Sequence, residues 1–498
     1  MKRIIKNTIG TYGRQIITAG LSLYSSRWVL NSLGQSEYGL YSLMGSLIVF
    51  ITFFNTVLAS SSVRYFAYEM GKGEKSELGR WFNAALSLHI ALALILVAIG
   101  WPIGEYLIRH ILRIPIIRLS SCLWVFRILL VSAFVSMVSV PFIAIFSANQ
   151  RITELSFWGV IQSVLSFILA WEMRTTLLDK LIVYAFGMMA IVVIIQFIQI
   201  ARAKNIYMDC KIDKQFWFEK KKLKDIFSFA LWNLFGSLGV LGRDQGSALL
   251  LNLSFGPTAN AAFGIASQVS AQANQLSTAM LGAFSPEITT SEGRGDRKIM
   301  LDLSLKACKL STILVMLLAV PLIAETDFIL KIWLLNPPNN ASTFCRMMLI
   351  TFLIDKLTIG YMLAINAQGK IARYQATLGT CLIMTLPLAW LFIKINPLPT
   401  SIGYAFMITM AVTSFGRVIW GKILLKLSIK NWIFDIFIPF IILGIILLVV
   451  ISIIKNSINA GYFRLLIIFI FNMILSSLFF VKIIYNGSCK SHVMNEYK

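Results

Sequence analysis

The long apolar runs of this chain constrain its fold more than any other feature. About fourteen segments are apolar over roughly 20 residues, the length at which an α-helix crosses the core of a bilayer. They cover approximately 8–30, 38–60, 81–104, 119–145, 154–173, 178–200, 226–251, 259–281, 307–333, 344–366, 375–394, 401–424, 432–454 and 461–483. Lipid offers the backbone no hydrogen-bond partners, so these segments are predicted as helices and not strands. Since only 13% of the 498 residues are charged and 57% are hydrophobic, the chain is predicted to be an all-α polytopic membrane protein with about 14 transmembrane helices.

Three pairs of short polar segments recur at nearly the same distance along the chain. They are NSLGQSEYGLY at 31–41 with NLSFGPTANAAFGIA at 252–266, GKGEK at 71–75 with GRGDR at 293–297, and ANQRI at 148–152 with AQGKI at 367–371. Gly34 and Gly256 of the first pair are 222 residues apart, as are the members of the second pair, and the members of the third pair are 219 apart. Repetition at one distance predicts an internal duplication, with matching segments in equivalent turns of two halves.

The distribution of lysine and arginine predicts which side of the membrane each connection faces. If the N-terminus is cytoplasmic and the loops alternate, the cytoplasmic connections carry most of the basic residues, as the positive-inside rule requires. Both termini are therefore predicted to be cytoplasmic, and much of the net charge of +23 encodes topology. Nucleic acid is disfavoured as a partner, because the basic residues are not concentrated on one soluble module.

The richest basic segment, at 201–224, separates two sets of six predicted helices. Since the seventh helix then starts from the same side as the first, the halves should be related by a pseudo-two-fold axis along the membrane normal. The predicted parts are an N-lobe at 1–200 with helices one to six, a basic cytoplasmic linker at 201–224, a C-lobe at 225–426 with helices seven to twelve, and helices thirteen and fourteen with a cytoplasmic tail at 427–498.

The sequence lacks the common signatures of a catalytic or metal site. Its six cysteines and three histidines show no spacing typical of a disulfide framework, a metal centre or a redox motif. The basic N-terminus precedes a helix without a small-residue cleavage site, so no cleavable signal peptide is predicted. No Walker A motif or Asp-x-Asp pair occurs, and the external connections are short. We therefore expect no metal, no cofactor and no enzymatic activity.

Four segments, taken in order, resemble a known transporter family. They are LGQSEYGLY, SSSVRYFAYEMGKGEKSE, FGPTANAAFGIASQVSAQANQ and SPEITTSEGRGDRKIM. Together with the helix count and the basic linker, they resemble the polysaccharide-exporter branch of the MATE-like flippases. This branch comprises the Wzx-type O-antigen and capsule flippases of the multidrug/oligosaccharidyl-lipid/polysaccharide exporter superfamily.

The resemblance implies a two-lobed flippase of the bacterial cytoplasmic (inner) membrane, with a central cavity that opens alternately to each side. Its cargo would be an oligosaccharide on undecaprenyl diphosphate, moved to the outer face for the biosynthesis of lipopolysaccharide O-antigen or another surface polysaccharide. The partners that this function implies are the lipid-linked oligosaccharide, membrane lipids, H⁺ or Na⁺ as a coupling ion, and polysaccharide polymerase and glycosyltransferases.

Basic residues inside the apolar segments are candidate functional groups, because an ionised side chain in a membrane is costly. The substrate-cavity candidates among them are Arg127, Arg243, Lys356, Arg14 and Arg27. Guanidinium and ammonium groups bind phosphate oxygens, so a cavity lined by these residues would suit a lipid diphosphate. Other roles stay open, since Arg27 and Lys309 lie near helix ends from which they can reach the headgroups, and Arg14 suits a structural ion pair equally well.

A row of amides marks the eighth predicted helix. Gln268, Gln272 and Gln275 are spaced by four and three residues, so they share one helical face. Such a face suits the hydroxyls of a sugar at a cavity wall. The alternative is hydrogen bonding between neighbouring membrane helices.

Two embedded carboxylates, Asp244 and Asp355, are candidates for ion coupling through an exchangeable proton or Na⁺. Each is adjacent to a basic residue, but neighbours on a helix do not face each other and need not form an ion pair. A cation-coupled multidrug (MATE) antiporter would need such a carboxylate, and the acid-poor, arginine-bearing first helix disfavours this alternative. A flippase for lipid-linked peptidoglycan precursors shares the diphosphate chemistry and stays open as a further alternative.

Overall fold

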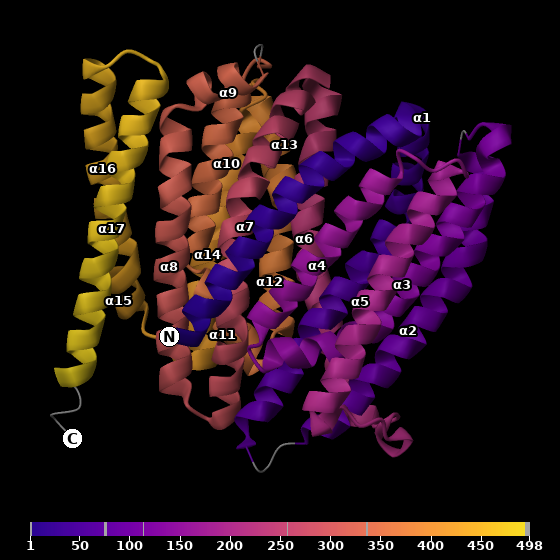
Figure 1. The fold of residues 1–498 in the computed structure, drawn as a ribbon. Coiled ribbons are helices and arrows are strands. Elements are labelled where there is room, and N and C mark those ends of the chain that lie inside the picture. Colours follow the sequence, from indigo (N-terminus) through magenta and orange to yellow (C-terminus); the bar gives the residue numbers. More distant parts are fainter. Residues whose placement is uncertain (1, 74–76, 113, 256, 335–336, 494–498) are drawn as a thin grey trace. The chain divides into compact units, whose positions relative to one another are not determined.

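The described part of the chain folds into helices joined by turns and loops (Figure 1). The computed structural model describes residues 2–73, 77–112, 114–255, 257–334 and 337–493, and no strand occurs among them. The helices form two compact units, one comprising Met1–Leu234 with Thr289–Asp296 and the other Phe235–Ile288 with Arg297–Lys498. The lobe boundaries expected at 200 and 225 stay predictions, because α6 (Lys220–Phe255) contributes to both units.

The first unit is built from five complete helices and parts of two more. They are α1 (Lys2–Gly71), α2 (Leu78–Tyr106), α3 (Leu119–Ala148), α4 (Ile152–Glu172) and α5 (Lys180–Ile206), with the start of α6 and the end of α7 (Pro257–Arg294). α1 packs against α3 and α4, and α3 packs against α2 and α5. Aromatic rings fill the core of this unit, where Phe66, Phe82 and Phe146 are fully buried.

The second unit holds the remaining helices. They are the other parts of α6 and α7, then α8 (Arg297–Ala324), α9 (Thr326–Leu334), α10 (Ala341–Lys356), α11 (Ile359–Gln368), α12 (Ala372–Ile383), α13 (Thr385–Ile395), α14 (Ser401–Leu425), α15 (Ile429–Trp432), α16 (Ile438–Ser457) and α17 (Tyr462–Val493). α14 packs against α10, α12 and α13, and α8 packs against α10, α11 and α17. A polar clamp attaches α17, because Arg464 on it reaches Glu325 at the end of α8 over 2.7 Å.

Ten helical segments in the described part are long and apolar enough to cross a membrane, or eleven if the bent pair α10 and α11 counts as one span. The expected count of fourteen is therefore not confirmed. The three further segments that were expected lie in the two arms of α1, on either side of Gly34, and in α7. α7 is absent from the ten because its sequence is rich in Gln, Asn, Ser and Thr.

The first repeated turn is a sharp break between two helical arms. Gly34 has φ 81° and ψ 165°, a conformation accessible to glycine, and α1 is helical on both sides of it. The matching turn of the second half is equally short, since α6 ends at Phe255 and α7 begins at Pro257. Gly256 lies outside the described residues.

The glycines of GKGEK and GRGDR have matching roles. The second glycine of each motif, Gly73 or Gly295, has a positive φ of 63° or 86° and ends the helix before it. The first glycines, Gly71 and Gly293, lie where α1 and α7 cross within the first unit. A Cβ atom on Gly71 would be 2.2 Å from the carbonyl oxygen of Thr290, and one on Gly293 would be 1.9 Å from that of Tyr68. The repeated motif thus combines a helix end with a backbone contact that only glycine permits.

The third repeated pair also matches in backbone conformation. Gln150 in ANQRI and Gly369 in AQGKI both have left-handed φ values, 58° and 90°, within two residues of the end of a helix. Together with the glycine motifs, these positions show the same local structures recurring at the distances found in the sequence.

A four-residue ion network ties the basic segment at 201–224 to the start of α2. The ammonium of Lys222 lies 2.8 Å from Glu77 and 2.6 Å from Glu219, and its side chain is only 8% exposed. Arg80 pairs with the same two carboxylates at 2.8 and 2.7 Å. Each carboxylate is therefore shared by two cations.

Acid should loosen this network. The hydrogen bond from Lys222 lowers the pKa of Glu77. Burial raises the pKa of Glu219, but the hydrogen bonds from Lys222 and Arg80 outweigh this effect, so the pKa of Glu219 is lowered as well. A lowered carboxylate pKa stabilises the fold above the ordinary value of 4.5 and loses that contribution as the pH falls below it. Hydrogen exchange of 208–222, corrected for its intrinsic pH dependence, should therefore be faster at pH 4 than at pH 7. Equal corrected rates would contradict the prediction, and Lys222→Met should reproduce the acid effect at pH 7.

Candidate functional site

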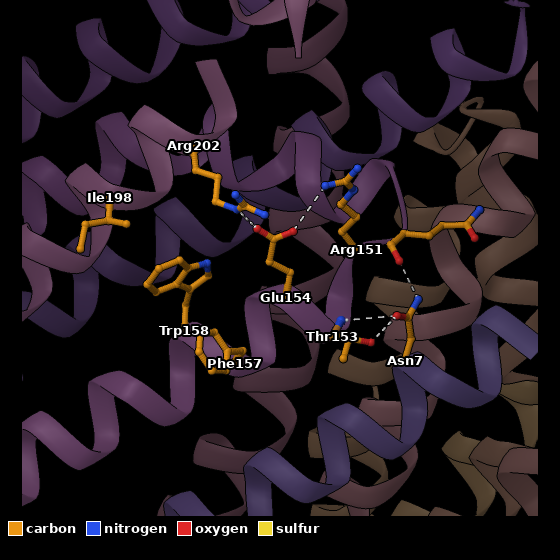
Figure 2. A pocket seen from close by; sticks show the side chains of 9 residues that line it. Asn7, Arg151, Thr153, Glu154, Phe157, Trp158, Ile198 and Arg202 are labelled. Carbon is orange, nitrogen blue, oxygen red and sulfur yellow. Dashed lines mark hydrogen bonds and ion pairs between the residues drawn. The ribbon is translucent and has the colours of Figure 1, made fainter. Parts of the chain in front are cut away.

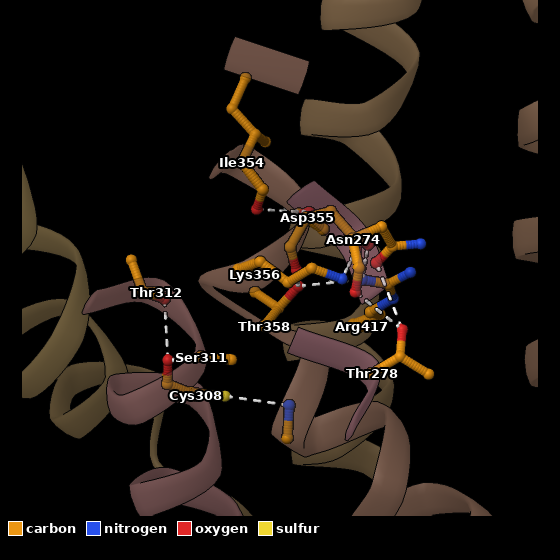
Figure 3. A network of polar contacts seen from close by, with 12 residues as sticks. Asn274, Thr278, Cys308, Ser311, Thr312, Ile354, Asp355, Lys356, Thr358 and Arg417 are labelled. Atoms are coloured by element: carbon orange, nitrogen blue, oxygen red, sulfur yellow. Dashed lines mark hydrogen bonds and ion pairs between the residues drawn. The ribbon is translucent and has the colours of Figure 1, made fainter. Parts of the chain in front are cut away.

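A charged triad lies buried in the second unit, where Asp355 is held between two cations (Figure 3). The Arg417 guanidinium on α14 donates to Asp355 Oδ1 over 2.6 Å, and the Lys356 ammonium lies 2.8 Å from Oδ2. The three side chains are only 4–12% exposed. Lys356 and Asp355 thus form an ion pair although they are adjacent on the helix, which the sequence left open.

The triad is located at a break in a membrane-spanning segment. α10 ends at Lys356 and α11 begins at Ile359 with a bend of 46°, so carbonyl groups at the break lose their helical partners. Side chains of other helices replace them. Ser414 donates to the carbonyl of Ile354, Arg417 to that of Asp355, and the Trp432 indole to that of Leu357, at 3.1, 3.3 and 3.1 Å. The break is therefore tolerated because protein groups, not lipid, satisfy its backbone.

The charges of this triad leave a surplus of one positive charge in the interior of the unit. Lys356 also occupies the C-terminal end of α10, where the helix dipole favours a cation. A carboxylate that already accepts from two cations is poorly suited to bind another cation or to exchange a proton. The surroundings of Asp355 therefore favour a structural role over ion coupling.

The second predicted pair, Arg243 and Asp244, lies on α6 in the same unit. Arg243 Nε donates to Asp244 Oδ1 over 2.8 Å, and its guanidinium carbon lies 4.9 Å from the centroid of the Phe406 ring. One terminal nitrogen of Arg243 is buried without a hydrogen-bond partner, whereas the Asp244 side chain is 42% exposed. Asp244 is thus the more accessible of the two candidate coupling carboxylates, but it is also bound to a cation.

Arg127 lies in the first unit and has a carboxylate partner. Its Nε and Nη2 atoms donate to Glu105 Oε1 over 2.8 and 2.5 Å, and its guanidinium carbon lies 5.5 and 5.3 Å from the rings of Trp101 and Trp124. Both tryptophans are exposed, as is typical of an aromatic belt at a membrane interface.

The counterpart of Arg127 in the second half is Arg346, which follows it by 219 residues. Arg346 pairs over 2.6 Å with Asp327, and Asp327 follows Glu105 by 222 residues. Both halves therefore carry an arginine–carboxylate pair at the same place in the duplication. Lys356 has no basic equivalent in the first half, because the residue 219 positions before it is Met137.

The remaining basic candidates have less defined surroundings. Arg14 lies against α4, where its Cδ atom would be 2.7 Å from a Cβ atom on Gly159. The side chain of Arg27 lies outside the described part of the structure. Lys309 is half-buried on α8 and has an interaction partner.

Gln268, Gln272 and Gln275 lie together on an exposed face of α7. The exposed residues of this face are Gly264, Gln268, Ala271, Gln272, Asn274, Gln275, Thr278 and Gly282. We call them the polar stripe. Among the described side chains of Pro257–Ile288, no large apolar one is exposed. By contrast, α14 exposes Ile408, Val412, Phe415, Ile419 and Ile423.

The polar stripe runs at the depth of membrane-spanning helices. The buried side of α7 packs along α10, where the Phe263 ring lies 5.9 Å from that of Phe344 and Ala273 joins a cluster with Leu349 and Phe352. A helix at this depth with an exposed polar face is typical of the wall of a water-filled cavity, since lipid would leave its amides without partners.

The structure thus brings together Asp355 with Lys356, Arg243 with Asp244, and the three glutamines with one another. Sequence reasoning missed Arg417, the group that anchors Asp355. The sequence could have revealed it, because Arg417 lies within the apolar segment 401–424 and is therefore a candidate functional group like the other embedded cations.

No family model matches the chain. The uncharacterized membrane protein EpsK of Bacillus subtilis (strain 168) is 23% identical over 331 residues, which make up 64% of this chain and 63% of EpsK, so the match spans less than two thirds of that relative.

Solved structures match over most of the chain. The outward-facing conformation of a multidrug resistance MATE family transporter of the MOP superfamily has a TM-score of 0.74 at 15% identity, covering 85% of this chain and 96% of that one. A MOP superfamily transporter from Pyrococcus furiosus, for which reverse polarity of the binding pocket suggests a different function, has a TM-score of 0.69 at 14% identity and coverages of 86% and 97%. This chain is therefore a multi-pass integral membrane protein with the fold of the MATE transporters.

Proposed function

We propose that this protein is a flippase that moves an undecaprenyl-diphosphate-linked oligosaccharide from the cytoplasmic to the outer face of the cytoplasmic membrane by alternating access, for surface polysaccharide biosynthesis. The observation that carries this proposal is the polar stripe of α7. Its amides donate and accept hydrogen bonds, as the hydroxyl groups of a glycan require, and it has no exposed large apolar side chain to hold a hydrophobic drug.

The embedded charges support an anionic cargo. Asp355 is already bound to Lys356 and Arg417, and Asp244 to Arg243, so both embedded carboxylates are neutralised by cations of the chain. A cation exporter needs a carboxylate that is free for its substrate. A buried surplus of positive charge, with one unpartnered nitrogen on Arg243, instead favours a diphosphate.

A lipid-linked peptidoglycan precursor has the same diphosphate and is the second candidate cargo. The polar stripe does not distinguish the two glycans, because amides bind sugar hydroxyls of either kind. The two cargoes are therefore compared in the same assay.

The test is a flipping assay in proteoliposomes with fluorescent undecaprenyl-diphosphate oligosaccharide, the matching peptidoglycan precursor and a cationic dye. The wild type is expected to flip the glycolipid and not to move the dye. Gln268→Leu/Gln272→Leu should slow flipping by about thirtyfold, because two lost hydrogen bonds, each contributing on the order of 1 kcal/mol, together raise the barrier by about 2 kcal/mol. The control Gln215→Leu changes an exposed amide outside the helices of the second unit and should leave the rate unchanged.

Each outcome of this assay is decisive for one part of the proposal. Dye movement without glycolipid movement would assign the chain to drug export. Glycolipid flipping that the double substitution leaves intact would remove the polar stripe from the cargo path. A preference for the peptidoglycan precursor would assign the second cargo.

A further inference from the structure

A pocket of about 710 Å³ lies in the first unit, between the start of α1, the start of α4 and the end of α5 (Figure 2). None of the predicted site residues lines it. Arg151 and Arg202 reach toward the carboxylate of Glu154 from opposite sides, as Figure 2 shows. Glu154 lies 3.6 Å from Arg151 and accepts a hydrogen bond from Arg202 Nε.

The two arginines keep donors available beyond this contact. Their side chains are 41% and 49% exposed, and Glu154 occupies one terminal nitrogen of Arg151 and the Nε of Arg202. One carboxylate between two guanidinium groups leaves the pocket with one net positive charge. A monoanionic ligand would complete this charge balance.

The rim of the pocket is held rigid by hydrogen bonds. The Asn7 amide donates to the carbonyl of Gln150 over 2.8 Å and accepts from the Thr153 hydroxyl over 2.9 Å. These bonds join α1 to the turn before α4, so they anchor the backbone of the turn that carries Arg151.

Apolar surface adjoins the charged groups. Phe157 and Ile198 line the pocket and are 60% and 40% exposed, and the Trp158 ring lies beside them. Of the 21 residues of α4, only Ser156 and Ala170 are fully buried, so apolar side chains of this helix stay partly accessible beside the pocket. A soluble anion would gain nothing from these apolar side chains, whereas a lipid has both a charged head and an apolar chain.

The position along the chain fits a membrane surface. Arg151 lies in the turn between the fourth and fifth predicted spans and Arg202 at the end of the sixth, both on the side predicted to be cytoplasmic. Basic pockets between membrane helices on this side bind acidic lipid headgroups.

We propose that this pocket binds the phosphate of an anionic phospholipid of the cytoplasmic leaflet, with Arg151 and Arg202 on the phosphate and an acyl chain along Phe157 and Ile198. A phosphodiester carries one negative charge, which matches the net charge of the pocket, whereas a diphosphate carries more. The site is distinct from the polar stripe, and the inference needs only that the chain is embedded in a membrane.

The test measures lipids retained by the purified full-length protein in native mass spectra, with phosphatidylglycerol and phosphatidylcholine added at equal concentrations. The wild type should retain phosphatidylglycerol preferentially. Arg151→Gln/Arg202→Gln should weaken that binding about fivefold for each arginine, the effect expected of one basic residue at an anionic surface. The charge-matched control Lys211→Gln/Lys214→Gln changes exposed residues of the basic segment and should retain the preference.

A second variant separates binding from folding. Glu154→Gln removes the competing carboxylate and should tighten phosphatidylglycerol binding, whereas a merely structural network would lose stability without gaining lipid. Equal retention of the two lipids by the wild type would overturn the proposal, as would a preference that survives the double arginine substitution. Displacement of phosphatidylglycerol by equimolar undecaprenyl-diphosphate oligosaccharide would overturn the assignment to a resident lipid. The flipping assay is independent, so either proposal can fail alone.

Discussion

Asp355→Ala is expected to be the most destabilising substitution in the second unit, by about 3–5 kcal/mol, because it leaves two buried cations without their shared carboxylate. Lys356 and Arg417 would then repel each other in the interior. Arg417 would also lose the contact that directs it to the carbonyl at the break between α10 and α11. The free energy of unfolding is measured by denaturant titration in detergent.

Asp302→Ala is the matched control, since it removes a carboxylate of the same unit. Asp302 pairs with Lys306 at 2.6 Å on the exposed surface of α8, so its loss should cost less than about 1 kcal/mol. If Asp355→Ala cost no more than Asp302→Ala, the triad would not stabilise the broken helix. Asp355→Asn should be intermediate, because the amide can still accept from Arg417.

Gly71→Ala is expected to destabilise the first unit by about 3 kcal/mol, although alanine is normally the better helix former. The added Cβ atom would lie 2.2 Å from the carbonyl oxygen of Thr290 and 2.8 Å from the amide nitrogen of Arg294. Both are backbone atoms, so no side-chain rotation can make room and the two helices must separate. Thermal unfolding in detergent measures the loss.

Gly13→Ala tests the same substitution on the same helix without the contact. Gly13 has no neighbouring atom within 4 Å of a Cβ, so alanine there should be neutral or slightly stabilising. Gly293→Ala should resemble Gly71→Ala, because its Cβ would meet the carbonyl of Tyr68. Tolerance of alanine at both Gly71 and Gly293 would mean that the crossing is looser than described.

The sequence predicts the helices well because their signal is local. An apolar run of sufficient length must be helical in lipid whatever surrounds it, so the positions of α2, α3 and α5 follow from composition alone. The segment expected at 307–333 is placed less well, because α8 ends at Ala324 and the rest of the segment belongs to α9. The repeated glycines are equally local, since a positive φ at Gly73, Gly295 or Gly369 is a property of one residue. The number of spans is harder to predict, because the exposed face of α7 is polar and its composition resembles that of a helix in a soluble protein.

The polar contacts could not be predicted because they depend on how helices rotate and on partners distant in the chain. The sequence places Arg127 inside an apolar segment, but its pairing with Glu105 requires α2 and α3 to face each other. Arg417 and Asp355 form an ion pair although they are 62 residues apart, and the sequence around either residue does not predict its partner. The glutamines of α7 were found because a spacing of three and four residues fixes one face of any helix.

The broken helix has a consequence for how the protein is made. α10 carries Asp355 and Lys356 and ends at a break whose carbonyls accept hydrogen bonds from later helices, and Arg417 is synthesised 62 residues after Asp355. Alone in the bilayer, the nascent α10–α11 segment would expose charge and bare backbone to lipid. We therefore expect the insertion of this segment to be completed together with α14, which brings Ser414 and Arg417 to the break.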